Sequence, residues 1–217
     1  MPREARQAKE ARAQRILGLL QAAYPNAHCE LNFASPWELL IATILSAQCT
    51  DKMVNAVTIE LFKKYRSAAA FAKADPGQLE QDLRRLGFFR MKAKNIKACC
   101  AKLMERHCGE VPQTMEELTQ LDGVGRKTAN VVLGNAFGQD EGIVVDTHVA
   151  RLSQRMGFTK ETDPVKIEQE LIRLVPRKSW TIFSHWMIWH GRRRCSARKP
   201  DCAGCEIRSL CPSAGNV

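Results

Sequence analysis

Apolar residues recur at helical spacing along most of this chain, and capping signals precede several of the apolar runs. Ser35-Pro36-Trp37-Glu38 combines a hydroxyl N-cap, a proline at the first helical position and a glutamate three residues after the cap. Thr114 and Glu117 repeat that capping arrangement. After each signal an apolar residue returns every three or four positions, which indicates one buried helical face. The pattern predicts helices at about residues 36–45, 76–86, 92–107, 114–121, 126–137, 147–156, 164–174 and 181–190.

The predicted elements are almost all helices. Residues 143–145, an Ile-Val-Val run, form the one stretch that resembles a strand, and no second stretch of this kind is present to pair with it. No run of apolar residues approaches the length of about 18 that indicates a membrane span. The charged N-terminal segment lacks the apolar centre of a signal peptide. The pattern therefore predicts an all-α protein of the cytoplasm.

The charge balance points to a polyanionic partner. Lys and Arg number 33 against 23 Asp and Glu, so the formal net charge is +10 and the pI is near 9.3. Such a balance favours nucleic acid as a partner. The chain also has nine cysteines. An odd number without a secretion signal argues against a disulfide framework and for a reducing compartment.

The segment LDGVGRKTANVVLGNAF is the most informative stretch of the chain. Gly123 and Gly125 flank one valine and permit a tight turn with exposed backbone amides. The residues that follow favour a helix, and helix N-termini attract phosphate. With the helix at 114–121 and that at 126–137, the segment predicts a helix-hairpin-helix that grips a DNA backbone without reading bases. An ordinary connection between two helices is the alternative.

Two side chains suggest chemistry at this hairpin. Lys127 follows the second glycine by two residues, where it is either a counter-ion for phosphate or a nucleophile. Asp146 lies nineteen residues later, at the start of the predicted helix 147–156, and its presence favours the second interpretation.

The C-terminal cysteines have the spacing C-x6-C-x2-C-x5-C. They are Cys195, Cys202, Cys205 and Cys211. Zinc sites more often use two short-spaced pairs separated by a longer gap. One x2 pair with two longer arms favours a [4Fe–4S] cluster, which takes four cysteine thiolates, over zinc or free thiols. Arg198 and Lys199 lie between the first two of these cysteines and would meet a phosphate backbone, unless they belong only to a solvated basic surface.

Taken together, these motifs resemble the endonuclease III family of bifunctional DNA glycosylases and abasic-site lyases. The resemblance rests on LLIATILSAQCTD, LDGVGRKTANVV, VVDTH and the cysteine spacing, in the family's order and over nearly the whole chain. It implies a six-helix barrel domain at residues 30–140. It also implies an iron–sulfur domain made of residues 1–29 and 141–217. The expected partner is double-stranded DNA that contains oxidised pyrimidines or abasic sites, bound by a monomer in the bacterial nucleoid.

The resemblance also implies roles for single residues. Lys127 matches the family's lysine, which attacks C1′ of the damaged nucleotide, expels the base and forms a Schiff base before β-elimination. Asp146 matches the catalytic aspartate, although a plain N-cap would use the same residue type. Gln48 matches the glutamine that fills the gap left by the lesion, and a polar residue late in a helix is its alternative.

The chain departs from the family pattern at two positions. Phe88 stands where the family usually has a leucine wedge between base steps, and the alternative is that Phe88 and Phe89 both pack inside. Asp122 stands where proline commonly precedes GVG, and its carboxylate should oppose DNA. The competing classes are an adenine-removing mismatch glycosylase, which usually lacks the lysine, a non-catalytic helix-hairpin-helix protein, and an electron carrier.

Overall fold

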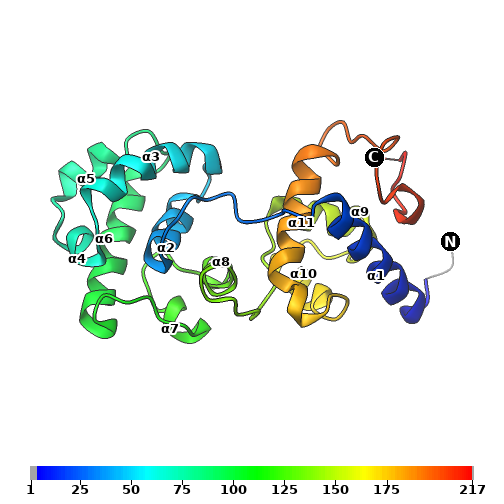
Figure 1. Ribbon diagram of the computed structural model, residues 1–217, viewed down its shortest axis with the longest axis horizontal. Helices are drawn as coiled ribbons and strands as arrows, with labels where there is room; N and C mark the ends of the chain where they lie inside the picture. The colour runs from blue at the N-terminus through cyan, green and yellow to red at the C-terminus, as the bar shows by residue number, and fades with distance from the viewer. Residues whose placement is uncertain (1–3, 217) are drawn as a thin grey trace. The chain divides into compact units, whose positions relative to one another are not determined.

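All regular secondary structure in the described residues is helical, which confirms the all-α fold class. The computed structural model describes residues 4–216, and Figure 1 shows the course of the helices. The α-helices are α1 (Arg6–Ala23), α2 (Pro36–Leu45), α3 (Asp51–Lys64), α4 (Ala68–Lys73), α5 (Pro76–Asp82), α6 (Phe89–His107), α7 (Met115–Thr119), α8 (Arg126–Phe137), α9 (Thr147–Arg155), α10 (Pro164–Leu171) and α11 (Trp180–Arg193). Two short 3-10 helices are η1 (Arg177–Ser179) and η2 (Arg208–Leu210).

The capping signals begin helices where the sequence predicts them. Ser35 Oγ accepts a hydrogen bond from the Glu38 amide at 3.4 Å, at the start of α2. Thr114 Oγ1 accepts one from the Glu117 amide at 3.2 Å, at the start of α7. Each bond satisfies a backbone N–H that has no partner within its own helix. The predicted starts of α2 and α7 are thereby confirmed.

Several elements differ from the sequence prediction. Helices α1, α3 and α4 were not predicted, and α6 begins at Phe89, earlier than the predicted residue 92. Residues 143–145 are buried but form no strand. The amide of Val144 donates to Ser184 Oγ at 3.1 Å, so a side chain of α11 takes the place of a sheet neighbour.

The chain divides into two compact units, and the first to be described is Cys29–Gln139. It contains α2 to α8. Helix α2 is its centre, because all seven residues from Leu39 to Leu45 are buried and the helix packs against α3, α6 and α8. A helix that is apolar on every side belongs inside a core. Because α2 is buried, the segments before and after it lead from the core to the surface.

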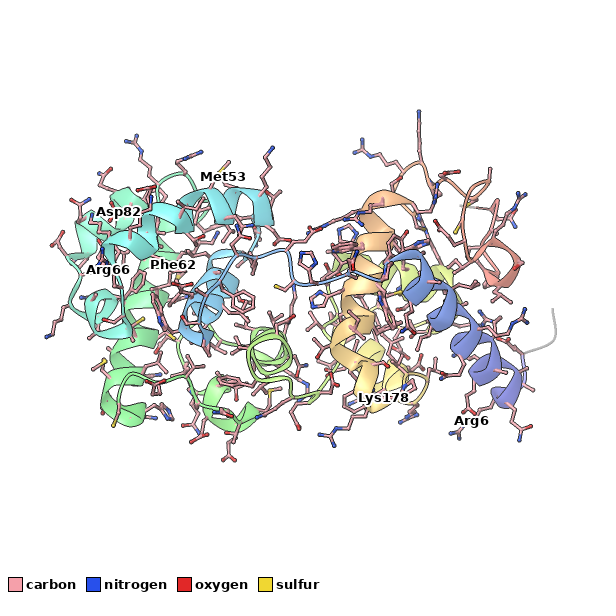
Figure 2. All side chains as sticks on the ribbon, viewed as in Figure 1. Arg6, Met53, Phe62, Arg66, Asp82 and Lys178 are labelled. Atoms are coloured by element: carbon pink, nitrogen blue, oxygen red, sulfur yellow. The ribbon has the colours of Figure 1, made fainter. Side chains whose placement is uncertain are left out.

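The second unit contains the described residues 4–28 and 140–216. In it, α11 packs against both α1 and α9, and α10 packs against α9. The N-terminal helix therefore shares a core with the segment that carries the C-terminal cysteines. Charged side chains such as Arg6 and Lys178 of this unit extend outwards (Figure 2). Within residues 4–216, none of the helices combines the length and the apolar character needed to cross a membrane.

Candidate functional site

The hairpin between α7 and α8 has the backbone that its glycines predict. Gly123 has φ +77°, and a Cβ at this position would lie 3.0 Å from the Cβ of Asn95. Both the conformation and the space therefore require glycine. Gly125 is the N-cap of α8, and a Cβ there would meet no atom within 4 Å. The first amides of α8 consequently open onto an uncrowded surface, as a phosphate site at a helix N-terminus requires.

Lys127 lies in the first turn of α8, with its side chain exposed. The opposite face of the helix packs into the core of unit Cys29–Gln139 through Ala129, Val132 and Leu133. The core contacts fix the helix, while the amine stays accessible to a large ligand. Lys127 belongs to this unit and Asp146 belongs to the other.

Asp146 is the N-cap of α9. Its Oδ1 accepts two hydrogen bonds, from the amides of His148 and Val149, each at 2.8 Å. These bonds fix the orientation of the carboxylate and leave Oδ2 for a further partner. The side chain is half-buried, so it can still meet a ligand. The alternative in which Asp146 is the N-cap of α9 is thus confirmed. This structural role does not prevent the carboxylate from also taking part in a reaction.

Gln48 and Phe88 share an unusual backbone conformation. Their φ angles are +54° and +57°, in the left-handed region that non-glycine residues rarely adopt. Phe88 is 66% exposed, whereas Phe89 packs against the core, so the alternative in which both rings are buried is wrong. Gln48 is also exposed. Strained backbone of this kind concentrates at functional sites.

Asp122 carries a partner that the sequence did not reveal. Its Oδ2 lies 2.9 Å from Lys102 Nζ, which also donates to the carbonyl of Gln120 at 3.0 Å. The alignment is that of an ion pair rather than of a hydrogen bond, since Oδ2 has no hydrogen-bond partner. The cation of α6 therefore offsets part of the negative charge beside the hairpin.

The four cysteines near the C-terminus line a single cavity. They are Cys195, Cys202, Cys205 and Cys211, all free thiols. Among the described residues, the side chains as placed form no group of three or more His, Cys, Asp or Glu that could hold a metal ion. Four thiols around one space nevertheless form a donor set that suits a four-cysteine cluster or a zinc ion. Arg155 Nη1 donates to Cys195 Sγ at 3.2 Å, which ties the first of the four cysteines to α9.

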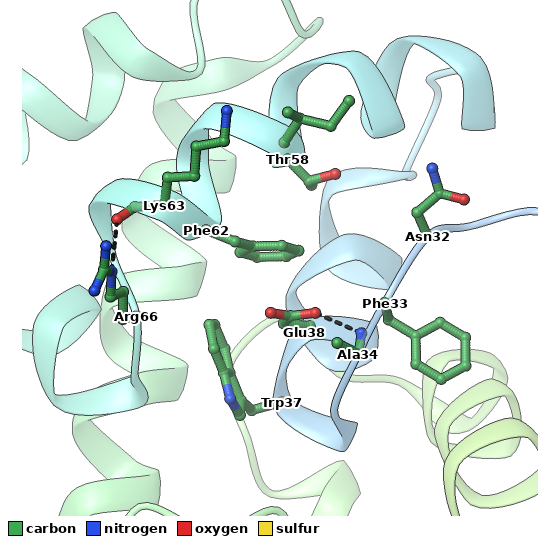
Figure 3. Close-up of a pocket in the computed structure, with 10 residues that line it drawn as sticks. Asn32, Phe33, Ala34, Trp37, Glu38, Thr58, Phe62, Lys63 and Arg66 are labelled. Atoms are coloured by element: carbon green, nitrogen blue, oxygen red, sulfur yellow. Dashed lines mark hydrogen bonds between the residues drawn. The ribbon is translucent and has the colours of Figure 1, made fainter.

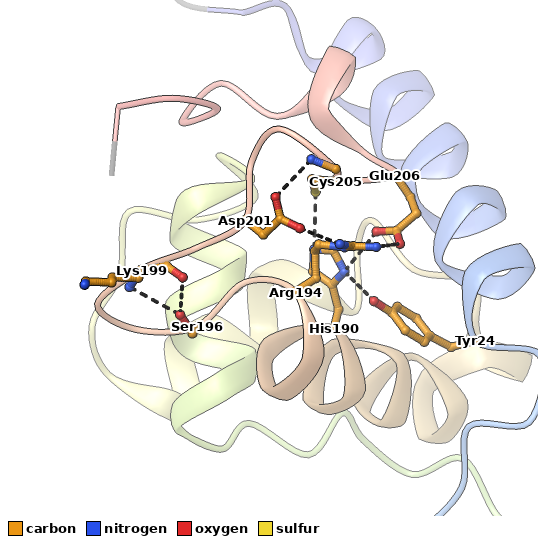
Figure 4. A network of polar contacts seen from close by, with 9 residues as sticks. Tyr24, His190, Arg194, Ser196, Lys199, Asp201, Cys205 and Glu206 are labelled. Carbon is orange, nitrogen blue, oxygen red and sulfur yellow. Dashed lines mark hydrogen bonds and ion pairs between the residues drawn. The ribbon is translucent and has the colours of Figure 1, made fainter.

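A buried histidine joins this cysteine loop to the N-terminal helix (Figure 4). His190 Nδ1 lies 3.0 Å from the Tyr24 hydroxyl, and its Nε2 lies 3.7 Å from Cys205 Sγ. Burial lowers the pKa of His190 to about 4 and raises the pKa of Tyr24 to about 12. With both groups neutral at pH 7, the hydroxyl donates to Nδ1 and Nε2–H points to the sulfur. Sequence reasoning missed Tyr24, Arg155 and His190, because no spacing rule connects positions so far apart.

Ion pairs and turns shape the rest of the loop. Arg194 pairs with both Asp201 and Glu206, at 2.5 and 3.0 Å (Figure 4). Ser196 Oγ donates to the Lys199 carbonyl at 2.6 Å and accepts from the Lys199 amide at 3.3 Å. The side chains of Arg198 and Lys199 are exposed, as a contact with phosphate requires.

A separate groove of about 570 Å³ lies beside α2 and α3 in unit Cys29–Gln139. The aromatic side chains of Trp37 and Phe62 face it from two helices (Figure 3). Glu38, also on its wall, is held by a hydrogen bond from the Ala34 amide at 2.6 Å. None of the candidate residues of the sequence analysis lines this groove.

Known protein families and sequences match this chain over most of its length. The family described as "HhH-GPD superfamily base excision DNA repair protein" matches residues 41–177. The endonuclease III of Synechocystis is 54% identical over 206 residues, covering 95% of this chain and 94% of that protein. The endonuclease III of Escherichia coli K12 is 42% identical over 202 residues, covering 93% and 95%.

Solved structures agree with the sequence relatives. A non-covalent endonuclease III–DNA complex superposes with a TM-score of 0.90 at 44% identity, covering 94% of this chain and 96% of that one. A trapped endonuclease III–DNA covalent intermediate matches with the same values. A thermostable thymine-DNA glycosylase shares the fold, with a TM-score of 0.85 at 21% identity over 94% of this chain and 97% of that one.

Proposed function

The chain belongs to the endonuclease III family within the HhH-GPD superfamily of base excision DNA repair proteins, and we propose that Lys127 is its nucleophile. The protein is a DNA glycosylase and abasic-site lyase. Its substrate is duplex DNA with oxidised pyrimidines or abasic sites, and it acts as a monomer in the bacterial nucleoid. The exposed amine of Lys127 beside a hairpin built for phosphate is the observation that carries the assignment.

The reaction begins with the neutral amine of Lys127. It attacks C1′ of the damaged nucleotide, the bond from C1′ to the base breaks, and the sugar is left as a Schiff base. Loss of a C2′ proton then expels the 3′ phosphate by β-elimination. Asp146 stabilises the positive charge that develops on the sugar and assists proton transfer. Its orientation is already set by two amide bonds to Oδ1, so little reorganisation is needed.

Gln48 and Phe88 handle the opened duplex. The lesion must leave the base stack before C1′ is accessible. Phe88, an exposed ring on a left-handed backbone, acts as the wedge, and Gln48 fills the gap that the lesion leaves. The amides after Gly123 and Gly125, with Arg198 and Lys199, hold the phosphate backbone.

The cysteine loop forms an iron–sulfur domain. Cys195, Cys202, Cys205 and Cys211, which line one cavity, would hold a [4Fe–4S] cluster, because they supply the four thiolates that such a cluster takes. When bound, the cluster supplies a rigid cross-link rather than a reactive centre. The chain's own residues then present Arg198 and Lys199 from a stiffened loop. In this assignment residues 30–140 are the barrel domain, and residues 1–29 with 141–217 are the cluster domain.

Borohydride trapping on abasic DNA tests the nucleophile. Reduction converts the Schiff base into a stable covalent bond between protein and DNA, so Lys127→Ala should lose trapping while it keeps its fold and its affinity for DNA. Arg126→Ala is the matched control, because it removes a positive charge from the same helical turn and retains the amine. Undiminished trapping by Lys127→Ala would show that another amine does the chemistry.

A further inference from the structure

Lys92 is a buried cation with a specific partner. Its side chain, in the first turns of α6, is 4% exposed. Its Nζ donates to Cys49 Sγ at 3.0 Å. Burying an ammonium group is costly unless a hydrogen-bond partner is provided. The segments that this hydrogen bond connects therefore indicate what Lys92 contributes.

The Lys92–Cys49 contact connects the segments that contain Gln48 and Phe88, the two residues with left-handed backbone. Cys49 directly follows Gln48, and the backbone amide of Lys92 donates to the Phe88 carbonyl at 3.1 Å. A continuous path of bonds thus runs from Gln48 through Cys49 and Lys92 to Phe88. Every step of the path lies within unit Cys29–Gln139. The path joins the connection after α2 to the start of α6.

Left-handed backbone must be held by its surroundings. A non-glycine residue in this region is strained, and it persists only where neighbouring contacts enforce it. The connection after α2 has local bonds, such as that from the Cys49 amide to the Ser46 carbonyl at 3.0 Å. These bonds set the shape of the turn but do not set its position against α6. The Lys92–Cys49 hydrogen bond adds a direct tie between this turn and α6, in addition to the packing of α2 against α6.

We propose that Lys92 is a positioning residue for lesion opening. Through Cys49 it holds Gln48 and Phe88 in register, so that wedge and gap-filler enter the duplex together. The inference rests on the proposed roles of Gln48 and Phe88. It predicts a defect in opening the duplex rather than in the chemistry at C1′.

Lys97 supplies a matched control on the same helix. Its Nζ donates to the carbonyls of Ala72 and Ala74 at 2.6 and 2.7 Å, so it ties α6 to the end of α4. Loss of either lysine amine removes a tie between α6 and another segment. The tie made by Lys92 leads to the strained residues, whereas the tie made by Lys97 does not.

The experiment follows 2-aminopurine placed next to 5-hydroxyuracil in a duplex, with a 2′-fluorine on the lesion nucleotide to prevent excision. Fluorescence rises when the probe base unstacks. Lys92→Met and Cys49→Ala should each slow the rise about 10-fold, equivalent to ~1.4 kcal/mol and typical of one hydrogen bond. Lys97→Met should change it by less than about two-fold, the scatter expected for an independent site. Cys49→Ser keeps an acceptor and should restore most of the rate.

Two further measurements separate positioning from simple damage to the fold. Borohydride trapping on single-stranded abasic DNA needs no opening of a duplex, so Lys92→Met should trap as well as the parent protein. The double variant Lys92→Met with Cys49→Ala should be no slower than either single variant, since both remove the same bond.

Three outcomes would overturn the inference. The first is a fluorescence rise in Lys92→Met that is as fast as in the parent protein. The second is a rise in Lys97→Met that is slowed as much as in Lys92→Met. The third is a loss of trapping by Lys92→Met on single-stranded DNA that is as large as its defect in opening the duplex. If Gln48→Ala and Phe88→Ala also open the duplex at the parent rate, the proposed roles of those two residues fail. If they open it slowly while Lys92→Met does not, only the link through Lys92 fails.

Discussion

The side chain of Asp146 has two roles: one of its oxygens caps α9, and its negative charge takes part in the proposed reaction. Two substitutions at this position separate the two roles. Asp146→Asn keeps an oxygen that can accept from the amides of His148 and Val149. Asp146→Ala removes that oxygen. Both remove the charge that we assign to the reaction. Stability should therefore distinguish the two variants, whereas catalysis should not.

The magnitude follows from the two 2.8 Å bonds to Oδ1. Loss of an N-cap costs about 0.5–2 kcal/mol, and the interaction of the carboxylate with the helix dipole contributes about 0.3–1 kcal/mol more. Asp146→Ala should thus lower the free energy of unfolding by about 1–3 kcal/mol. Asp146→Asn loses only the dipole contribution, and we expect a decrease below ~1 kcal/mol.

Tryptophan fluorescence during urea unfolding measures the effect in the relevant unit. Trp180, Trp186 and Trp189 lie on α11, which packs against α9, while Trp37 lies in the other unit. Excision of an oxidised pyrimidine under single turnover measures the chemistry. If Asp146→Asn excises at the parent rate, the residue is a cap and nothing more. If Asp146→Ala is as stable as the parent, the energetic reasoning from the two hydrogen bonds is wrong.

Two other predictions concern the hairpin and the cysteine loop. Asp122→Asn should tighten binding to abasic DNA by roughly 1 kcal/mol or less, mainly at low salt, because the charge is screened and already paired with Lys102. Titrations at several salt concentrations measure this, and equal affinity at the lowest salt would show that the carboxylate has no effect on DNA. Protein prepared anaerobically should be yellow-brown with about four irons per chain, and Cys202→Ala should lose them. Stoichiometric zinc in place of iron would contradict the cluster assignment.

The sequence alone was sufficient to predict a structural feature wherever the interaction that determines the feature is local. The caps at Ser35 and Thr114 bond to amides three residues away, so the motif contains both partners. Gly123 is likewise identifiable, because a positive φ is a property of one residue. The missed helix α1 also carried a readable signal, since its buried residues have helical spacing at Ala13, Ile16, Leu17 and Leu20. Frequent charges on its other faces hid that stripe.

Only the tertiary structure decided what depends on distant partners. Phe88 and Phe89 have the same side chain, and nothing local says which ring is exposed; the left-handed backbone at Phe88 turns one outwards while the other packs on the core. The same holds for Lys92, whose helical position predicts burial of its neighbours but not a bond to Cys49, 43 residues away. His190 and Tyr24 are 166 residues apart. Such pairs meet because packing of whole helices brings them together, and helix packing is determined by the sum of many apolar contacts rather than by any motif.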